Sequence, residues 1–237
     1  MSRRRRKFSR EPFEVRVEDL SHDGRGVATR EDKTIFIHGA LPGESVEARL
    51  TGRRRRYDEG ETLRVLEPSP HRIEPRCPHF GQCGGCSLQH LAPERQIEAK
   101  QRTLEQNLAR IGKVTPDTLW PPLTGPLWGY RRKARLSVRY VHKKGRVLVG
   151  FRERYGRFVA DLAECHVLDP RIAGQLVPLA ELIHGMDARS VIPQIEVACG
   201  DESAALVFRH LEPLSDDDIG LLRQFEADSG LAVLLQP

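Results

Sequence analysis

The feature that most constrains this chain is a group of three cysteines in the segment Arg76–His90, which has the sequence RCPHFGQCGGCSLQH. Cys77, Cys83 and Cys86 follow the spacing C-x5-C-x2-C, and the whole chain of 237 residues has five cysteines. The glycine pair between the last two cysteines lets the backbone turn tightly around a bound inorganic centre. The segment therefore predicts a loop that is shaped by a metal ion or a cluster.

The start of the chain gives the expected compartment. The charged stretch MSRRRRKFSR is not followed by an apolar segment, and no apolar run reaches the length of about 20 residues that a membrane span needs. We therefore expect a cytoplasmic protein with no membrane association. In that compartment thiols stay reduced, so clustered cysteines indicate metal binding or catalysis more than disulfides.

Three thiolates call for a fourth ligand. Cys165 lies in the polar stretch ECHVLDP, whereas Cys199 lies in an alternating strand and resembles a small buried hydrophobic residue. We therefore prefer Cys165. Zinc sites usually pair two short knuckles, and one five-residue gap with a remote ligand favours an iron–sulfur cluster over zinc, with unligated thiols as a third interpretation. A radical S-adenosylmethionine enzyme would need the spacing C-x3-C-x2-C, which this segment lacks.

Residues 12–67 predict a small β-barrel. Alternating apolar residues in FEVRVEDL mark one strand, and four further short strands separated by glycine- and proline-containing turns follow within sixty residues. Five such strands are typical of an oligonucleotide-binding-like barrel. Gly24 and Gly26 suggest the start of a dinucleotide fingerprint, but the third glycine is replaced by Thr29, so we predict a β-turn there.

The rest of the chain predicts an α/β domain. A helix is expected from Pro93 to Gly112, followed by a proline-rich linker over 116–126. Strands are expected over 132–141 and 145–154, a helix over 170–184, and a hairpin that turns at Gly200 and Asp201. A helix over 215–230, with Ser215 as its N-cap, and a final strand complete the pattern.

The net charge of +5 is distributed in three basic runs, which suggest a polyanionic partner. Solvated faces or a disordered tail are the alternative interpretation of each run, and a core aromatic residue is the alternative for Tyr130. One run is Arg3–Lys7 in a tail over 1–11 that we expect to be disordered. The predicted RNA-binding residues come from the other two runs and are Arg53, Arg54, Arg55, Arg56, Tyr130, Arg131, Arg132 and Arg135.

The segments RCPHFGQCGGCSLQH, WGYRRKARLSVRY and AECHVLDP together resemble the RNA uracil-C5 methyltransferases, and the members that act on bacterial 23S ribosomal RNA match best. The resemblance covers nearly the whole chain. It implies a TRAM domain over 12–70, a cluster loop over 71–96 and a central α/β RNA-binding domain over 97–237. It also implies a [4Fe–4S] cluster whose four ligands are Cys77, Cys83, Cys86 and Cys165.

The sequence departs from the family pattern in one respect. It has neither a glycine-rich S-adenosylmethionine site after a strand nor a motif for a nucleophilic cysteine, since Cys199 lies in a sequence, ACGD, that does not match. We therefore expect an α+β chain from which the Rossmann-like methyltransferase domain is absent. On this interpretation the chain holds no catalytic residue, would use S-adenosylmethionine only through a missing C-terminal domain, and is inactive alone.

The resulting functional hypothesis is the N-terminal RNA-recognition and iron–sulfur part of a methyltransferase that forms 5-methyluridine in 23S ribosomal RNA. We expect a monomer. Two alternatives stay open. One is a non-catalytic RNA-binding module with a structural four-cysteine metal site. The other is an enzyme of the same family that acts on transfer RNA.

Overall fold

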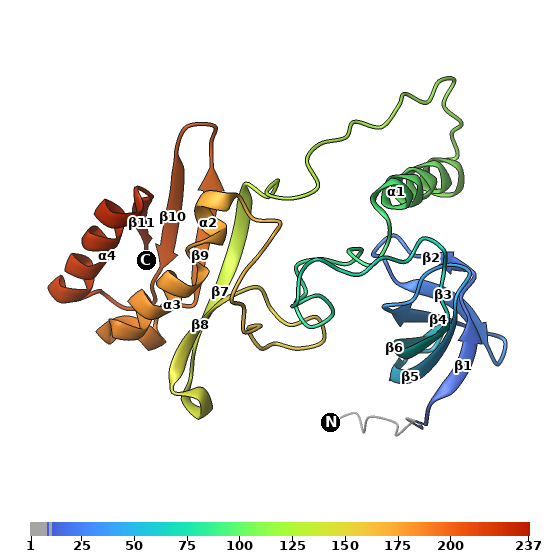
Figure 1. Ribbon diagram of the computed structural model, residues 1–237, viewed down its shortest axis with the longest axis horizontal. Coiled ribbons are helices and arrows are strands. Elements are labelled where there is room, and N and C mark those ends of the chain that lie inside the picture. Colours follow the sequence, from blue (N-terminus) through green and yellow to red (C-terminus); the bar gives the residue numbers. More distant parts are fainter. Residues whose placement is uncertain (1–8, 10) are drawn as a thin grey trace. The chain divides into compact units, whose positions relative to one another are not determined.

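The computed structural model describes residue 9 and residues 11–237, and the predicted basic run Arg3–Lys7 lies outside the described residues. The chain divides into two compact units (Figure 1). The first unit comprises Met1–Pro75 and Ser87–Leu123, and the second comprises Arg76–Cys86 and Thr124–Pro237. The cysteine segment thus belongs to the second unit up to Cys86, and the residues after it belong to the first.

The first unit is built on one six-stranded sheet with the order β1-β5-β6-β4-β3-β2. Its strands are β1 (Phe13–Arg16), β2 (Asp19–Leu20), β3 (Gly26–Arg30), β4 (Lys33–His38), β5 (Ser45–Arg53) and β6 (Tyr57–Glu67). Strands β4 and β6 are parallel, and the other neighbours are antiparallel. Strand β1 also packs against β3, so the sheet curls around a small core. That core consists of Val17, Ala28, Ile35, Ile37, Ala40, Val46, Ala48 and Leu50.

The predicted count of five strands is wrong, because the sheet has six. The additional strand is β2, which spans only two residues and pairs with β3. Both β1 and β2 lie within the stretch FEVRVEDL, whose alternation predicted one continuous strand, so periodicity did not reveal the division between them. The prediction of a turn at Gly24 is confirmed, since Gly24 adopts a left-handed φ of 83° and its N–H donates to the Ser21 carbonyl at 2.9 Å.

The predicted helix from Pro93 to Gly112 is present in two pieces. The α-helix α1 (Pro93–Asn107) begins with proline at its first turn and continues into a π-helical turn, η1 (Leu108–Gly112). Lys113 then ends the helix in the left-handed conformation. The proline-rich stretch that follows carries exposed apolar side chains such as Trp120 and Leu123.

The second unit contains a five-stranded sheet with the order β11-β10-β9-β7-β8. Its strands are β7 (Lys133–Val141), β8 (Arg146–Gly150), β9 (Gln194–Cys199), β10 (Ala204–Arg209) and β11 (Ala232–Gln236). Only β10 and β11 are parallel, since helix α4 (Asp216–Ser229) connects them as a crossover. The predicted hairpin at Gly200 and Asp201 joins β9 to β10.

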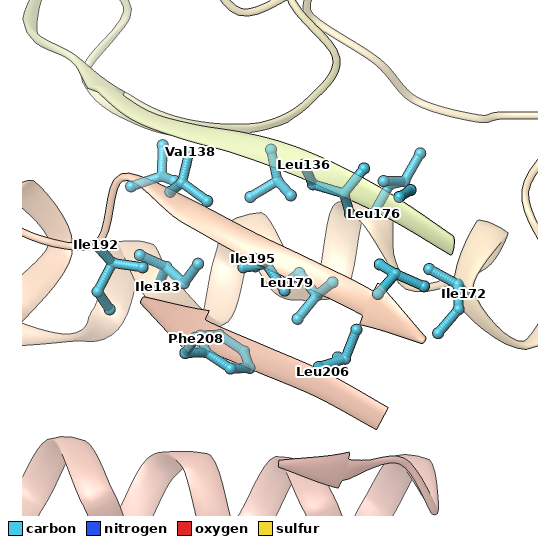
Figure 2. Packing of buried hydrophobic residues seen from close by; sticks show 14 of the residues in the cluster. Leu136, Val138, Ile172, Leu176, Leu179, Ile183, Ile192, Ile195, Leu206 and Phe208 are labelled. Carbon is cyan, nitrogen blue, oxygen red and sulfur yellow. The ribbon is translucent and has the colours of Figure 1, made fainter. Parts of the chain in front are cut away.

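Helices cover one face of this sheet (Figure 1). The helix expected over 170–184 is divided at Gly174 into α2 (Pro170–Ala173) and α3 (Leu176–Gly185). One short 3-10 turn, η3 (Asp187–Ser190), follows α3, and another, η2 (His142–Lys144), joins β7 to β8. Figure 2 shows the core that results. Its labelled side chains come from both layers and are Leu136, Val138, Ile172, Leu176, Leu179, Ile183, Ile192, Ile195, Leu206 and Phe208.

The start of α4 confirms the predicted N-cap. The Ser215 hydroxyl accepts a hydrogen bond from the Asp218 N–H at 3.1 Å, and Gly230 ends the helix with a left-handed φ of 68°. Asp218 is itself buried, and its two carboxylate oxygens accept the N–H groups of Asp187 and Ala188 at 2.9 and 3.1 Å. A first-turn acid predicted from charge alone therefore also anchors the neighbouring turn η3.

The opposite face of the sheet is polar along β7. Ala134, Leu136 and Val138 are buried, while Arg135 and Arg139 point away from the core, as the alternating faces of a strand require. Within the described part of the chain, no helix combines the length and the apolar character that a membrane span requires.

Candidate metal centre

All four cysteines that the sequence proposes as ligands lie in the second unit. Cys77, Cys83, Cys86 and Cys165 are all half-buried there, although almost eighty residues separate the last two in sequence. Cys83 and Cys165 pack against the core of that unit. The fold therefore holds the remote fourth cysteine in the same compact unit as the other three.

The four thiols interact with one another electrostatically. Burial raises the pKa of the Cys83 thiol, and the negative charges of Cys86, Cys165 and Cys77 raise this pKa further, against a lowering hydrogen bond from the Gly85 N–H. Burial likewise raises the pKa of Cys77, with added contributions from Cys165 and Cys86. A bound cation would reverse this mutual repulsion, because each thiolate would then face positive charge.

The cysteine turn is held by backbone pairing with the segment that follows β8. The Gly84 N–H donates to the Arg152 carbonyl at 2.9 Å, and the Arg154 N–H donates to the Gln82 carbonyl at 2.8 Å. The approach is close, since a Cβ on Gly84 would lie 3.0 Å from the Arg152 carbonyl oxygen. The glycine pair is thus required for this close contact between two chain segments.

Two arginines bind the cysteine turn through its carbonyl groups. Arg131 donates from Nη1 to the Gly85 carbonyl at 3.3 Å, and its guanidinium lies 4.6 Å from the centroid of the Phe151 ring. Arg154 donates from Nη2 to the Cys86 carbonyl. Both guanidinium groups thus hold the backbone of the cysteine turn through its carbonyl oxygens.

The chemistry of the donor set fits an iron–sulfur cluster. Four thiolates in one unit, a glycine pair and an N–H donor to the Cys83 sulfur at 3.4 Å are features of such sites. Within residues 9 and 11–237, however, the structure shows no group of three or more histidine, cysteine, aspartate or glutamate side chains that could hold a metal ion. The ligand assignment thus remains a prediction.

Cys199 lies apart from this group. It ends β9, and its N–H donates to the Arg132 carbonyl at 2.8 Å. Burial and then the negative charge of Asp169 raise the pKa of its thiol. Asp169 in turn is paired with Arg171, whose side chain lowers the pKa of that carboxyl group to about 2. The surroundings of Cys199 are thus an ion pair and the edge of the core.

The predicted RNA-binding residues of the second unit divide into two kinds. Tyr130 is 55% exposed, so it is not a core residue, and partial burial followed by the charge of Cys86 raises its pKa. Arg132 and Arg135 are exposed and pair with Asp201 at 2.5 Å and Glu196 at 3.0 Å. Arg131 is half-buried against the cysteine turn, which makes it a structural residue of the loop.

The arginines of the first unit lie between β5 and β6. Arg53 is 3.9 Å from Asp58 and Arg54 is 3.2 Å from Glu59, and both side chains remain largely exposed. Arg55 and Arg56 are exposed at the connection between the two strands. Their binding of RNA remains a prediction, and the exposure of all four guanidinium-bearing side chains suits contact with phosphate.

Sequence reasoning missed the segment Phe151–Arg154 as part of the candidate centre. Its only visible signal was the basic and aromatic sequence FRERYGRF, which follows a strand and contains no cysteine or histidine. Its contribution consists of backbone pairing and of arginine contacts to carbonyl groups, and neither has a signature in residue types.

Comparison with known proteins identifies relatives of the first unit and of the whole chain. The TRAM domain family matches residues 6–63, which include the whole barrel core of the first unit. The 23S rRNA (uracil(1939)-C(5))-methyltransferase RlmD of Alkalilimnicola ehrlichii is 55% identical over 100% of this chain and 53% of its own length. The enzyme of the same name from Xanthomonas oryzae pv. oryzae is 54% identical over 100% of this chain and 54% of its own length. Over its entire length the chain is therefore similar to enzymes of the RNA uracil-C5 methyltransferase family. It spans about half the length of the curated relatives it matches.

The family's fold extends over most of the chain. The crystal structure of the Pyrococcus abyssi tRNA (uracil-54, C5)-methyltransferase in complex with S-adenosyl-L-homocysteine matches 88% of this chain and 48% of that chain, with a TM-score of 0.60 and 22% identity. Our expected fold class, an α+β chain with a five-stranded barrel from which the Rossmann-like methyltransferase domain is absent, is therefore corrected. Most of the chain has the fold of a methyltransferase of this family, with two sheets, because the barrel and the central sheet are themselves parts of that fold.

Proposed function

We propose that this chain recognises RNA and carries an iron–sulfur cluster in a methyltransferase that forms 5-methyluridine in 23S ribosomal RNA. The observation that carries the proposal is identity above 50% over the entire chain to enzymes named for that reaction. The electrostatic coupling of the four thiols in one unit supports the cluster. The basic residues of β7 and of the β5–β6 connection support RNA as the partner.

In this proposal the four cysteines hold the cluster and thereby fix the irregular loop. Arg131 and Arg154 keep the loop against the Phe151 segment through its Gly85 and Cys86 carbonyl groups. Methyl transfer requires no electron transfer from the cluster, so its role here is structural. Tyr130, which lies beside the loop, is then held in a defined position on the surface.

The reaction sets what RNA recognition must achieve. C5 of uracil becomes nucleophilic once a thiolate adds to C6, and S-adenosylmethionine supplies the methyl group when it is bound. A base then removes the C5 proton and the thiolate is expelled. The target base has to leave its stack for these steps, so the residues of this chain would bind the flanking phosphates and unstacked neighbours.

The first prediction concerns the RNA surface of β7. Replacing both Arg132 and Arg135 with alanine should weaken binding of a 23S ribosomal RNA fragment and flatten the salt dependence of that binding. The reason is that a protein with fewer phosphate contacts releases fewer counterions when it binds. Tyr130→Ala should cost roughly 1–3 kcal/mol of binding free energy with a nearly unchanged salt slope if the ring stacks on a base. Fluorescence anisotropy at several salt concentrations measures both quantities.

The matched control for these variants is Arg223→Ala, in which an exposed arginine of α4 is removed far along the sequence from the basic strand. It should leave RNA affinity unchanged. Arg131 stays intact throughout, since its loss would disturb the cysteine turn. Unchanged affinity in all the β7 variants, with folding preserved, would move the RNA surface to the arginines between β5 and β6.

The second prediction is that the 237-residue chain transfers no methyl group by itself. The sequence has no glycine-rich motif for the methyl donor and no motif for the nucleophilic cysteine. Incubation with labelled S-adenosylmethionine and unmodified 23S ribosomal RNA should give label at background level. Turnover above background would contradict the prediction and would also make Cys199, as the cysteine outside the candidate centre, the first residue to replace.

Two other functions remain as alternatives. A purely structural RNA-binding module would bind RNA in the same way. The two functions differ in one test: under this alternative, a protein that contains this segment and has the length of the relatives would not methylate uracil. A transfer RNA substrate is less favoured, because the tRNA enzyme shares 22% identity whereas the 23S enzymes share 54–55%. Competition between a 23S fragment and transfer RNA for the chain distinguishes the substrates.

A further inference from the structure

A short hairpin directly follows β8 and contains the segment that pairs with the cysteine turn. We refer to residues 151–160 as the arginine–aromatic hairpin. Arg152 and Val159 form a bridge, the Glu153 N–H donates to the Phe158 carbonyl at 2.9 Å, and the Ala160 N–H donates to the Phe151 carbonyl at 2.9 Å. The chain reverses at Gly156. These bonds give the hairpin a defined backbone although it lies outside the named strands.

The tip of the hairpin displays two aromatic rings on the surface. Tyr155 is 54% exposed and Phe158 is 64% exposed, while Phe151 at the base is buried in the core. Arg152 and Arg157 are exposed beside these rings, and Glu153 is the one acidic residue of the hairpin. Large aromatic side chains next to arginines are the combination that binds unpaired bases, since the rings stack and the cations meet phosphate.

The other edge of the hairpin is fixed to the cysteine turn. Cys83 forms a bridge with Glu153, and the hydrogen bonds of Gly84 and Gln82 described above continue this pairing on both sides. The Arg154 guanidinium adds a side-chain contact, because it lies 5.3 Å from the Phe80 ring centroid and donates to the Cys86 carbonyl. The position of the two exposed rings is therefore set by the conformation of the cysteine turn.

We propose that the tip of the arginine–aromatic hairpin, with Tyr155 and Phe158, is a stacking site for unpaired bases of RNA, and that the cysteine turn positions it. The proposal rests on the proposed function in one respect, which is that RNA is the partner. Single-stranded RNA is the occupant that fits, because the faces of paired bases in a duplex are already stacked. The three arginines of the hairpin against one glutamate provide the charge complementarity to phosphate.

The test uses the 237-residue chain purified without oxygen and a fluorescent single-stranded oligoribonucleotide, free or annealed into a duplex. Tyr155→Leu and Phe158→Leu keep apolar volume and remove the aromatic face. Each should weaken single-strand binding about 5- to 150-fold, with little change in the salt slope. Tyr155→Phe, which keeps the ring, should restore binding. Arg157→Ala should instead flatten the salt slope.

Trp120→Ala is the matched control, since Trp120 is 85% exposed in the proline-rich stretch and should leave affinity unchanged. If the original chain binds no RNA, both the proposed function and this site are overturned. If it binds RNA and the two leucine variants bind equally well with unchanged melting curves, the hairpin site alone is overturned. Equal losses for single strand and duplex would also exclude base stacking.

The dependence on the cysteine turn has its own readout. Gly84→Ala would place a methyl group 3.0 Å from the Arg152 carbonyl oxygen and so push the turn away from the hairpin. It should weaken single-strand binding, while Gly220→Ala, a change in α4 where an added Cβ meets no atom within 4 Å, should not. Equal affinity of the Gly84 variant and the original chain would show that the hairpin binds independently of the turn and would overturn that part of the proposal.

Discussion

A Cys86→Ser variant should be purified with less than about one iron per chain, whereas the original protein, purified without oxygen, should be brown and contain about four. The serine hydroxyl does not ionise near neutral pH and cannot replace a thiolate ligand. The backbone carbonyl of residue 86, which accepts from Arg154, is kept in the variant. Loss of iron would therefore report on the sulfur atom. Iron and sulfide analysis with the visible absorption spectrum measures this effect.

Cys199→Ser is the matched control. Cys199 is also a half-buried free thiol, but it interacts electrostatically with Asp169, Arg171 and Arg132. The variant should keep the full iron content. Stoichiometric zinc without sulfide in the original protein would show that the site binds zinc and not an iron–sulfur cluster. Loss of iron on changing Cys199 but not Cys165 would show that the fourth ligand was assigned wrongly.

Removal of the Glu44 side chain should destabilise the first unit by about 3–5 kcal/mol. Glu44 is completely buried, and its carboxylate accepts Nε and Nη2 of Arg72 at 2.6 and 2.8 Å. It also accepts the N–H groups of Leu41 and Ser69 at 2.8 and 3.1 Å. Glu44→Ala leaves the Arg72 guanidinium and two N–H groups without this partner. Urea unfolding followed by circular dichroism measures the loss.

Glu67→Ala provides the comparison, because Glu67 forms an exposed pair with Arg16 at 3.5 Å. Its loss should cost less than about 1 kcal/mol. Similar effects of the two changes would contradict the role assigned to burial.

The Glu44 pair also predicts a pH dependence. Burial raises the pKa of the Glu44 carboxyl group, but the bonds from Arg72, Leu41 and Ser69 lower it more, so the net change is downward. A carboxyl group with a lowered pKa in the folded state stabilises the protein above its usual pKa of about 4.3, and this contribution is lost as the pH falls further. Glu44→Gln should therefore reduce the dependence of stability on pH below about pH 4.

The candidate centre was predictable as far as residue types and spacing carry it. The spacing of Cys77, Cys83 and Cys86 and the polar surroundings of Cys165 selected four of the five cysteines, and this selection stays a prediction because Cys199 lies in the same unit. The role of Arg131 was not predictable. A run of arginines indicates a polyanion, whereas its contact with the Gly85 carbonyl depends on where the cysteine turn lies in space.

The sequence by itself determined the local elements of this protein. Alternation along β7, the Ser215 cap and the turn at Gly24 depend on neighbouring residues and were correctly inferred. The tertiary structure decided the sixth barrel strand, the burial of Glu44 against Arg72 and the pairing of the cysteine turn with the arginine–aromatic hairpin. The last two features join residues far apart in the chain, through charge and through backbone hydrogen bonds. Such contacts leave no periodic pattern in sequence, because their partners are chosen by the folded geometry and not by residue type.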